Sequence, residues 1–245
     1  HAQPWFNQPT LGCAFKDLAD SDHFFILASD MRNEQPIANY WIRKAALQGS
    51  KITSMHYKAL DLNYPNAIQL TRSPQDLVQS LLTLVQSISR IKSCAASEFE
   101  PLFKLIKPCK DIEKTAKTLC EAKLPHIILG TSAINHPQAR LIYALAAWLK
   151  NTLQGRLGQL PDGSNIVGAY HVGFLPQHTP NPKQKTHHLW EQGHSVYWLH
   201  QIEPQWDTAH KQEAIAALKQ AKWVVNAATF ENTWANEYAD LLMKR

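Results

Sequence analysis

The chain has 245 residues, of which 44% are hydrophobic and 18% are charged. This hydrophobic share is ordinary for a globular protein, so a disordered chain is excluded and one large core or two smaller ones can form. No apolar run approaches the ~20 residues of a membrane-spanning helix, which predicts no direct membrane insertion. The formal net charge is +5, but the basic residues are scattered, and this argues against a nucleic-acid partner.

Metal-ligand sets and the common catalytic motifs are missing from the sequence. His187, His188 and His194 gather near a proline-rich segment, but only Glu191 stands beside them as a further ligand, so we predict no metal site. Glycine-rich phosphate loops and the G-x-S-x-G nucleophile motif are absent, and no catalytic residue is predicted. The cysteines form no C-x-x-C pair, which excludes a zinc ribbon or a local iron–sulfur motif and indicates reduced thiols: Cys13, Cys94, Cys109 and Cys120.

The first elements in chain order form a strand–helix–strand unit. Residues 24–28 are an apolar run of strand length, Pro36 suits the first turn of a helix, and Gly49 suits its C-terminal cap. An extended pattern returns at 51–55. Strands that alternate with helices of this length form parallel sheets with right-handed crossovers, so the sequence predicts an α/β fold.

The same order of strand, loop, proline and helix recurs later in the chain. After an amphipathic helix at 74–92, an apolar run at 126–130 is followed by Pro137 and another helix, and a third unit begins at 195–199. We interpret the recurrence as a duplication that gives two similar α/β halves. The predicted domains are a first half at 20–95, a helical connector at 96–122 and a second half at 123–242 with a glycine-rich loop at 155–176.

The glycine-rich loop at 155–176 has two interpretations. Glycines permit positive φ angles and close backbone approach, which a ligand-binding loop uses. A compact surface loop without a ligand has a similar composition. Both interpretations stay open from composition alone.

The ordered motifs of the second half resemble those of the molybdopterin oxidoreductase superfamily. A strand ending at Gly130 is followed by Asn135-His136-Pro137 and then by a Leu-Pro-x-Gly-x-Asn segment at 160–165. The chain closes on an Ala-Asp-Leu-Leu segment at 239–242, so the resemblance covers residues from about 24 to 242. Within the superfamily, the order is most similar to the large iron–sulfur subunit of bacterial NADH–quinone oxidoreductase, which is respiratory complex I.

This resemblance implies two Rossmann-like three-layer α/β halves with mainly parallel sheets. It also implies a set of positions that match the loops contacting the nucleotide tail of a pterin cofactor. These cofactor-binding candidates are Gly130, Asn135, His136, Asn165 and Asp76.

The first half departs from the family pattern. The loop at 28–36 keeps only Pro36 of the family's Gly-x-Asn-Pro-x-x-x-x-Pro, and Met55-His56-Tyr57 stands where the family has Asp-Pro-Arg. The acidic partner of the nucleotide is thereby lost. Because one lost buried hydrogen-bond partner costs about 1–3 kcal/mol, we interpret the five candidate positions as a vestigial site.

The resemblance to the complex I subunit implies a structural, non-catalytic domain without a cofactor of its own. Iron–sulfur clusters would be bound by an N-terminal part of a longer chain, and we expect this sequence, which begins with His1, to be a fragment. The partners would be other peripheral-arm subunits on the cytoplasmic side of the bacterial inner membrane. The alternative is the cofactor-tail-binding part of a live molybdenum or tungsten oxidoreductase such as a formate dehydrogenase, and an independent nucleotide-binding protein is a weaker third hypothesis.

The eight tryptophans bear on the structural hypothesis. Tryptophan is enriched at the centres of protein interfaces, but it is also mostly buried within single chains. For Trp190 and Trp206, both interpretations stay open.

Overall fold

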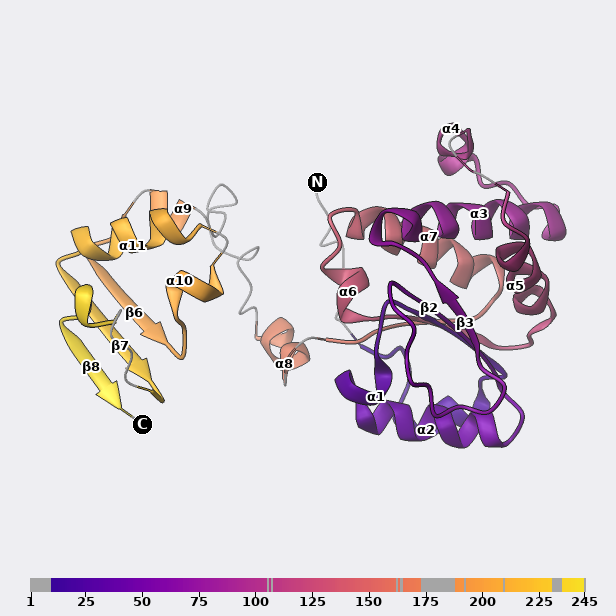
Figure 1. The fold of residues 1–245 in the computed structure, drawn as a ribbon, viewed down its shortest axis with the longest axis horizontal. Coiled ribbons are helices and arrows are strands. Elements are labelled where there is room, and N and C mark those ends of the chain that lie inside the picture. Colours follow the sequence, from indigo (N-terminus) through magenta and orange to yellow (C-terminus); the bar gives the residue numbers. More distant parts are fainter. Residues whose placement is uncertain are drawn as a thin grey trace. The chain divides into compact units, whose positions relative to one another are not determined.

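The computed structural model divides the chain into two compact units, His1–Gly168 and Ala169–Arg245 (Figure 1). We describe each unit by itself. The residues that the structure describes are 10–104, 106, 108–161, 163, 165–172, 188–191, 193–208, 210–230 and 235–244. Among the helices of these ranges, none has the length and apolar composition needed to cross a membrane.

The first unit is built on a five-stranded, wholly parallel sheet with the order β3-β2-β1-β4-β5. Its central strands are buried on both faces, as expected for a parallel sheet between two helical layers. The strands are β1 (His23–Leu27), β2 (Lys51–His56), β3 (Ile68–Thr71), β4 (Pro125–Leu129) and β5 (Arg156–Gln159).

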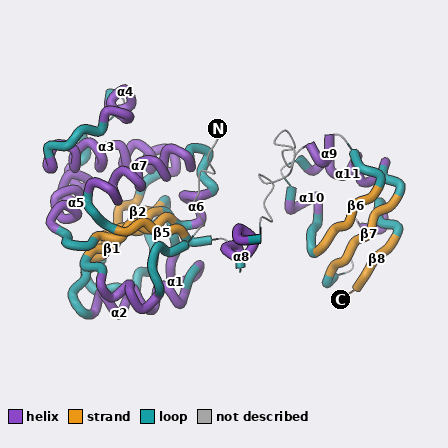
Figure 2. Tube along the Cα trace, turned by 180° about the vertical axis from the view of Figure 1, so that it is seen from behind, coloured by secondary structure: helices purple, strands orange, loops and turns teal. Residues whose placement is uncertain are grey.

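Helices cover both faces of this sheet, and the two opposite views agree on their placement (Figures 1 and 2). One face carries α3 (Pro74–Lys92), α5 (Lys110–Glu121) and α7 (Ala139–Thr152), and the other carries α1 (Met31–Glu34) and α2 (Pro36–Leu47). Shorter helices complete the unit: η1 (Phe15–Asp20), η2 (Ser97–Phe99), α4 (Glu100–Phe103), α6 (Thr131–Ile134) and α8 (Ile166–His171), of which α8 runs across the boundary between the units.

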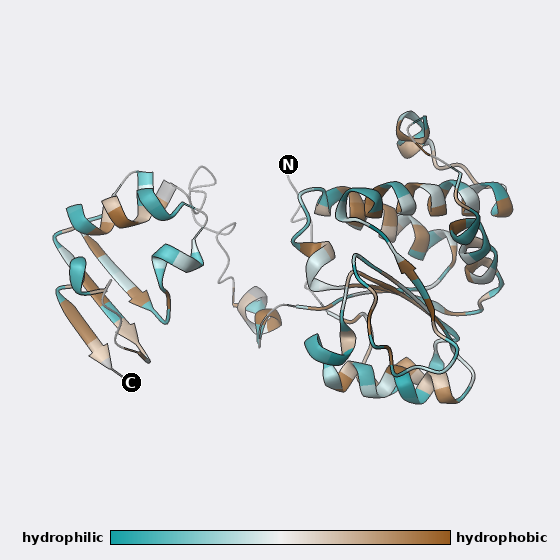
Figure 3. Cartoon of the chain, in the orientation of Figure 1, coloured by the Kyte–Doolittle hydropathy of each residue, from teal (hydrophilic) through white to brown (hydrophobic). Residues whose placement is uncertain are grey.

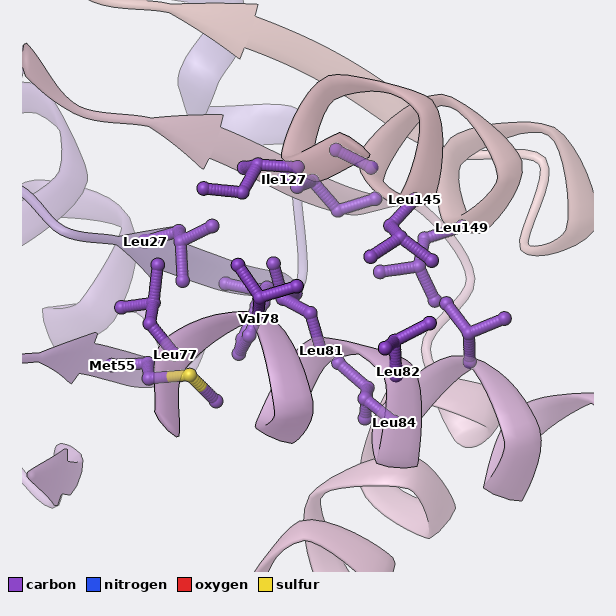
Figure 4. Packing of buried hydrophobic residues seen from close by; sticks show 14 of the residues in the cluster. Leu27, Met55, Leu77, Val78, Leu81, Leu82, Leu84, Ile127, Leu145 and Leu149 are labelled. Carbon is purple, nitrogen blue, oxygen red and sulfur yellow. The ribbon is translucent and has the colours of Figure 1, made fainter. Parts of the chain in front are cut away.

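The alternation of side chains along the strands divides the core of the first unit into two layers. Phe25 and Leu27 pack with the layer of α3, α5 and α7. Phe24 and Ile26 pack with α2 on the other side. Figure 4 shows the first layer, in which strand residues meet the apolar stripes of two helices: Leu27, Met55 and Ile127 from the sheet, Leu77, Val78, Leu81, Leu82 and Leu84 from α3, and Leu145 and Leu149 from α7.

The predicted domain boundaries differ from the structure. Strand β4 of the predicted second half pairs with β1 of the first half, residue for residue along their whole length. The predicted connector at 96–122 contains α5, which packs within the same core, and the boundary between units falls at 168/169 instead. Successive units of one doubly wound sheet repeat strand and helix just as a duplication does, and the sequence pattern does not separate the two cases.

The second unit holds a smaller parallel sheet with the order β6-β7-β8. Its core consists of Tyr197, Leu199 and Val224 from the strands and Leu218 from α11, with Tyr238 from the last connection. Two parallel sheets with helices confirm the predicted α/β class. The elements are α9 (His188–Glu191), β6 (Val196–His200), α10 (Pro204–Asp207), α11 (Lys211–Gln220), β7 (Trp223–Ala228), η4 (Ala235–Glu237) and β8 (Leu241–Lys244).

Trp190 and Trp206, for which core packing and interface contact both stayed open, differ in how far they are buried. Trp190 packs within the unit, with its ring stacked on Tyr197 at a centroid distance of 5.6 Å. Trp206 in α10 is 73% exposed. Core packing therefore accounts for Trp190 and does not account for Trp206.

Two buried histidines give the first unit a pH-dependent stability. His23 bonds Thr53 Oγ1 at 3.0 Å, and His126 Nε2 bonds the carbonyl oxygen of Leu11 at 2.9 Å. Burial lowers the pKa of each imidazole from 6.5 to about 4. The unfolded chain therefore takes up protons below pH 6.5 that the folded unit does not bind until about pH 4, so stability is lost as the pH falls through this window.

We expect each of these histidines to remove about 2 kcal/mol of unfolding free energy between pH 7 and pH 5. In His126→Gln, an amide replaces the imidazole as donor to Leu11 and does not titrate, so urea unfolding of this variant should lose about 2 kcal/mol less than the wild type over that range. His200→Gln, at an exposed histidine of the second unit, is the matched control. Equal pH dependence of the wild type and His126→Gln would contradict the assignment.

Candidate functional site

The topology of the first unit places its candidate site at the carboxyl ends of β1 and β4. Strand β1 leads into α1 and α2 on one face of the sheet, and β4 leads into α6 and α7, with α7 on the opposite face. In open parallel sheets, the crevice at such a reversal of strand order is the usual place for a ligand. The side chains that follow these strand ends therefore decide what the site can bind.

Gly130 sits where the loops after β1 and β4 meet. Its amide N donates to the Leu27 carbonyl oxygen at 2.8 Å, which continues the ladder between the two strands. A Cβ atom at this position would collide with the Ser29 side chain and the Ala28 carbonyl oxygen. Glycine is required here by the contact of two backbones, whatever the site binds.

Two carboxylates follow β1, Asp30 in the loop and Glu34 at the end of α1. The buried Ser29 hydroxyl donates to Glu34 Oε2 at 2.8 Å. Asp30 Oδ2 accepts from Asn33 Nδ2 at 3.0 Å and lies 3.8 Å from Lys58 Nζ. An anionic group brought to this loop would meet negative charge where a phosphate-binding loop offers free backbone N–H groups.

The basic side chains that follow the strand ends are already paired with acids. Lys58, after β2, faces Asp30, and Arg32 in α1 pairs with Asp61. Arg72, after β3, donates to Asp111 Oδ2 at 2.5 Å and to Ser80 Oγ at 3.1 Å, and its charge is thus compensated.

His56 ends β2, directly after Met55, which stands where the family pattern has its acidic residue. Its Nδ1 accepts a hydrogen bond from the Lys58 amide N at 3.2 Å, and its Nε2 is buried without a partner. Burial lowers the pKa of His56, so the neutral ring is favoured. The ring carries no negative charge, and it cannot replace a carboxylate as the acceptor for a ribose or a guanine.

Asp76, Asn135 and His136, three of the predicted cofactor positions, lie at the same edge of the sheet as Gly130. Their hydrogen bonds and positions belong to the ends of helices α3 and α6. Asp76 Oδ2 accepts from the Ser73 hydroxyl at 2.6 Å, and its amide N donates to Ser73 Oγ at 3.1 Å, which caps the start of α3. His136 Nε2 bonds the Pro74 carbonyl oxygen at 3.1 Å, and Asn135 is the C-cap of α6. The partner of His136, Pro74, lies two residues before Asp76 in the chain, so the structure brings these two predicted positions near each other.

Asn165 is not joined to the other four predicted positions by any hydrogen bond within the described part of the chain. It adopts a positive φ of 59° in the turn before α8. Its side chain lies against Gly168, where a Cβ atom would collide with the amide group. The predicted glycine-rich loop at 155–176 contains the whole of β5 and the whole of α8, so only parts of it are loop.

Sequence reasoning missed Ser29, Glu34 and Lys58. Ser29 and Lys58 each follow the last residue of a parallel strand by two positions, and Glu34 ends the short helix after β1. This placement after a strand end is the signal that could have found them. The described residues hold no group of three or more His, Cys, Asp or Glu that could bind a metal ion. His187, one of the clustered histidines, lies outside the described residues.

Strand order and two-sided helical cover define the first unit as a doubly wound α/β fold with the strand order of dinucleotide-binding domains. A model of the molybdopterin oxidoreductase family matches residues 3–243, and the chain belongs to this family. The predicted superfamily is confirmed. The closer relation to the complex I subunit stays a prediction.

One solved structure similar to the chain is the formyltransferase/hydrolase complex from Methylorubrum extorquens in complex with methylofuran. The two chains share 12% sequence identity with a TM-score of 0.61, and the match covers 97% of this chain and 66% of that chain. The likeness shows the fold, and this chain spans about two-thirds of the length of its match. No curated protein sequence matches the chain.

The contact at Gly130 can be tested by a single methyl group. We expect Gly130→Ala to lower the unfolding free energy by about 1–3 kcal/mol, because Ser29 and the Ala28 carbonyl must both move away from the added methyl group. Gly163→Ala is the matched control, since a Cβ atom there makes only ordinary contact with Ile166. Urea unfolding measures both, and equal stabilities would contradict the close contact of the two loops.

Proposed function

We propose that the chain is a structural, non-catalytic domain with the molybdopterin oxidoreductase fold, working as part of a multisubunit complex. The observation that carries this proposal is the pair of carboxylates that follow β1, Asp30 in the loop and Glu34 at the end of α1. This loop matches the one that contacts the nucleotide tail of the cofactor in pterin-binding family members. A pyrophosphate here would lie beside like charges, and the nearby Lys58 is already paired with Asp30.

The positions that survive from the family pattern have structural reasons to survive. Gly130 avoids a collision with Ser29, and His136 bonds the start of α3. The Asp76 carboxylate accepts from the hydroxyl of Ser73, the N-cap of that helix. A live cofactor site, the alternative hypothesis, is not needed to explain them. The same residues thus support a domain that keeps its fold after losing its ligand.

The sequence resemblance favours respiratory complex I as the parent complex. In this proposal, the chain is the family domain of the subunit that carries electrons from NADH toward quinone. Its iron–sulfur clusters would lie in another part of the longer subunit, and its partners would be other peripheral-arm subunits at the cytoplasmic side of the bacterial inner membrane.

The fold comparison favours a second parent. The matched chain belongs to a complex named for formyl transfer and hydrolysis, and the match extends over 97% of this chain. In this second version of the proposal, the chain has a structural role in an enzyme complex of that class and binds no cofactor nucleotide. The charged loop after β1 is consistent with either parent.

Nucleotide binding tests the structural role. We expect no heat of binding when the folded chain is titrated calorimetrically with millimolar GMP or GDP, which mimic the tail of the cofactor. The variant that combines Asp30→Asn with Glu34→Gln removes both negative charges and should bind GDP more tightly than the wild type. Saturable wild-type binding near 1 μM, about −8 kcal/mol, would overturn the proposal and favour a live oxidoreductase.

The parent complex is tested in the native cell. The tagged protein would be purified with its partners, and the fractions assayed for NADH oxidation and for formyl transfer or hydrolysis. Co-purification with NADH oxidation supports complex I, and co-purification with formyl chemistry supports the second parent. Purification of the chain with neither activity would contradict both.

A further inference from the structure

A cavity of about 330 Å³ lies between helix α7 and the edge strand β5 of the first unit. This volume falls in the range of small-molecule sites, about 300–1,000 Å³. The described lining comes from α7, β5 and Thr10, whose carbonyl oxygen accepts from the Gln159 amide N at 2.8 Å. It includes none of the residues that we assigned to the crevice after β1 and β4, so this is a second place where a ligand can bind.

Helix α7 gives the cavity a polar wall. The helix contributes Tyr143, Ala147, Lys150 and Asn151 to the lining. Their spacing of three to four residues places them on one side of the helix. The helices over this face of the sheet carry both hydrophilic and hydrophobic residues (Figure 3), and the apolar side of α7 packs in the core. Except for Ala147, the side toward the cavity offers hydrogen-bonding groups.

Gln159, at the end of β5, brings a buried amide to the cavity. Side chains alternate along a strand, and Leu157 packs with the layer of α3, α5 and α7. Gln159, two residues later, therefore points to the α7 side as well. It is only 4% exposed, and its Oε1 has no hydrogen-bond partner in the described part of the chain. Because a buried acceptor without a partner destabilises a fold, this amide points to a donor that a ligand supplies.

Lys150 is the one formally charged residue of the described lining. It is exposed, and no carboxylate pairs with it within the described ranges, whereas Arg72, after β3, is paired with Asp111. A ligand for this cavity therefore carries negative charge. The carbonyl groups at the C-terminal end of α7 add partial negative charge near Lys150. A carboxylate with its single charge is thus favoured over a phosphate.

We propose that this cavity binds a small hydroxycarboxylic acid. Its carboxylate accepts from the Lys150 ammonium, its hydroxyl donates to Gln159 Oε1, and its apolar body lies against Ala147 and Leu157. The inference goes beyond the proposed function and does not depend on it, since the nucleotide titration concerns the carboxylates after β1. Binding of such an acid requires no catalysis, so a structural domain can perform it.

Calorimetric titration of the full chain with 4-hydroxybenzoate tests the cavity, because this molecule carries a carboxylate and a hydroxyl on an apolar ring. We expect saturable binding with a dissociation constant below about 1 mM. Lys150→Met keeps a long side chain without the charge and should weaken binding about tenfold or more. Lys114→Met is the matched control, because Lys114 is an exposed lysine of α5 outside the lining, and it should bind like the wild type.

Gln159→Leu separates a ligand-binding amide from a structural one. Leucine removes the unpartnered amide, so the urea midpoint should rise, while the affinity for 4-hydroxybenzoate should fall about tenfold. Benzoate lacks the hydroxyl, and it should bind to Gln159→Leu and to the wild type with equal affinity.

Circular dichroism first establishes that each variant is folded, and the exposed Lys150→Met decides the outcome if Gln159→Leu is unfolded. No saturable binding of 4-hydroxybenzoate up to about 10 mM would overturn the proposal. Equal affinities of Lys150→Met and Lys114→Met would overturn it as well. A folded Gln159→Leu that is less stable than the wild type and binds the acid equally well would do the same, since the amide would then have a structural role.

Discussion

The pairing of β1 with β4 is the interaction on which the first unit depends. It joins strands that are about 100 residues apart in the chain, and it is fixed at both ends. At the entry, the Asp22 carboxylate accepts from the amide N atoms of Lys123 and Leu124 at 2.7 and 2.9 Å. At the exit, Gly130 N donates to Leu27. Burial alone would raise the pKa of Asp22, but these backbone hydrogen bonds outweigh it and lower the pKa.

The pairing of β1 with β4 also forms the crevice at their carboxyl ends and limits which ligands that crevice can bind. Because β1 and β4 send their helices to opposite faces, their exit loops border the place where this topology binds ligands. Here the loops touch at Ser29 and Gly130, and Ser29 turns its hydroxyl to Glu34. The fold thus has the strand order of a nucleotide-binding domain, but the side chains after β1 include two carboxylates, Asp30 and Glu34. Function has to be argued from those side chains, because one fold serves many activities.

The buried strands and long helices could be predicted from the sequence, because apolar runs and helical spacing are local signals. The apolar run at 24–28 corresponds to β1, and the amphipathic stripe at 74–92 coincides with α3. The edge strands were missed. In β3 only Leu70 is buried, and β5 contains Gly158, so neither has the composition of a buried strand.

Pairing and site chemistry could not be predicted in the same way. The partner of β4 is set by contacts across about 100 residues, and strand sequences alone do not encode register between distant strands. The position of Gly130 was predicted from a motif, but its reason, the collision with Ser29, requires both loops in space. Asn165 was predicted from the same kind of motif, and its contact is the local one with Gly168.

The two sheets differ in how completely their faces are covered. In the first unit, both faces of the sheet are covered, and the cations after the strand ends are matched by carboxylates. In the second, Trp198 and Trp223 leave one face open. An enzyme concentrates its unsatisfied groups in a pocket, where they meet a substrate. In the second unit, apolar side chains such as Trp198 and Trp223 stay exposed on a strand surface instead of lining a pocket around polar groups.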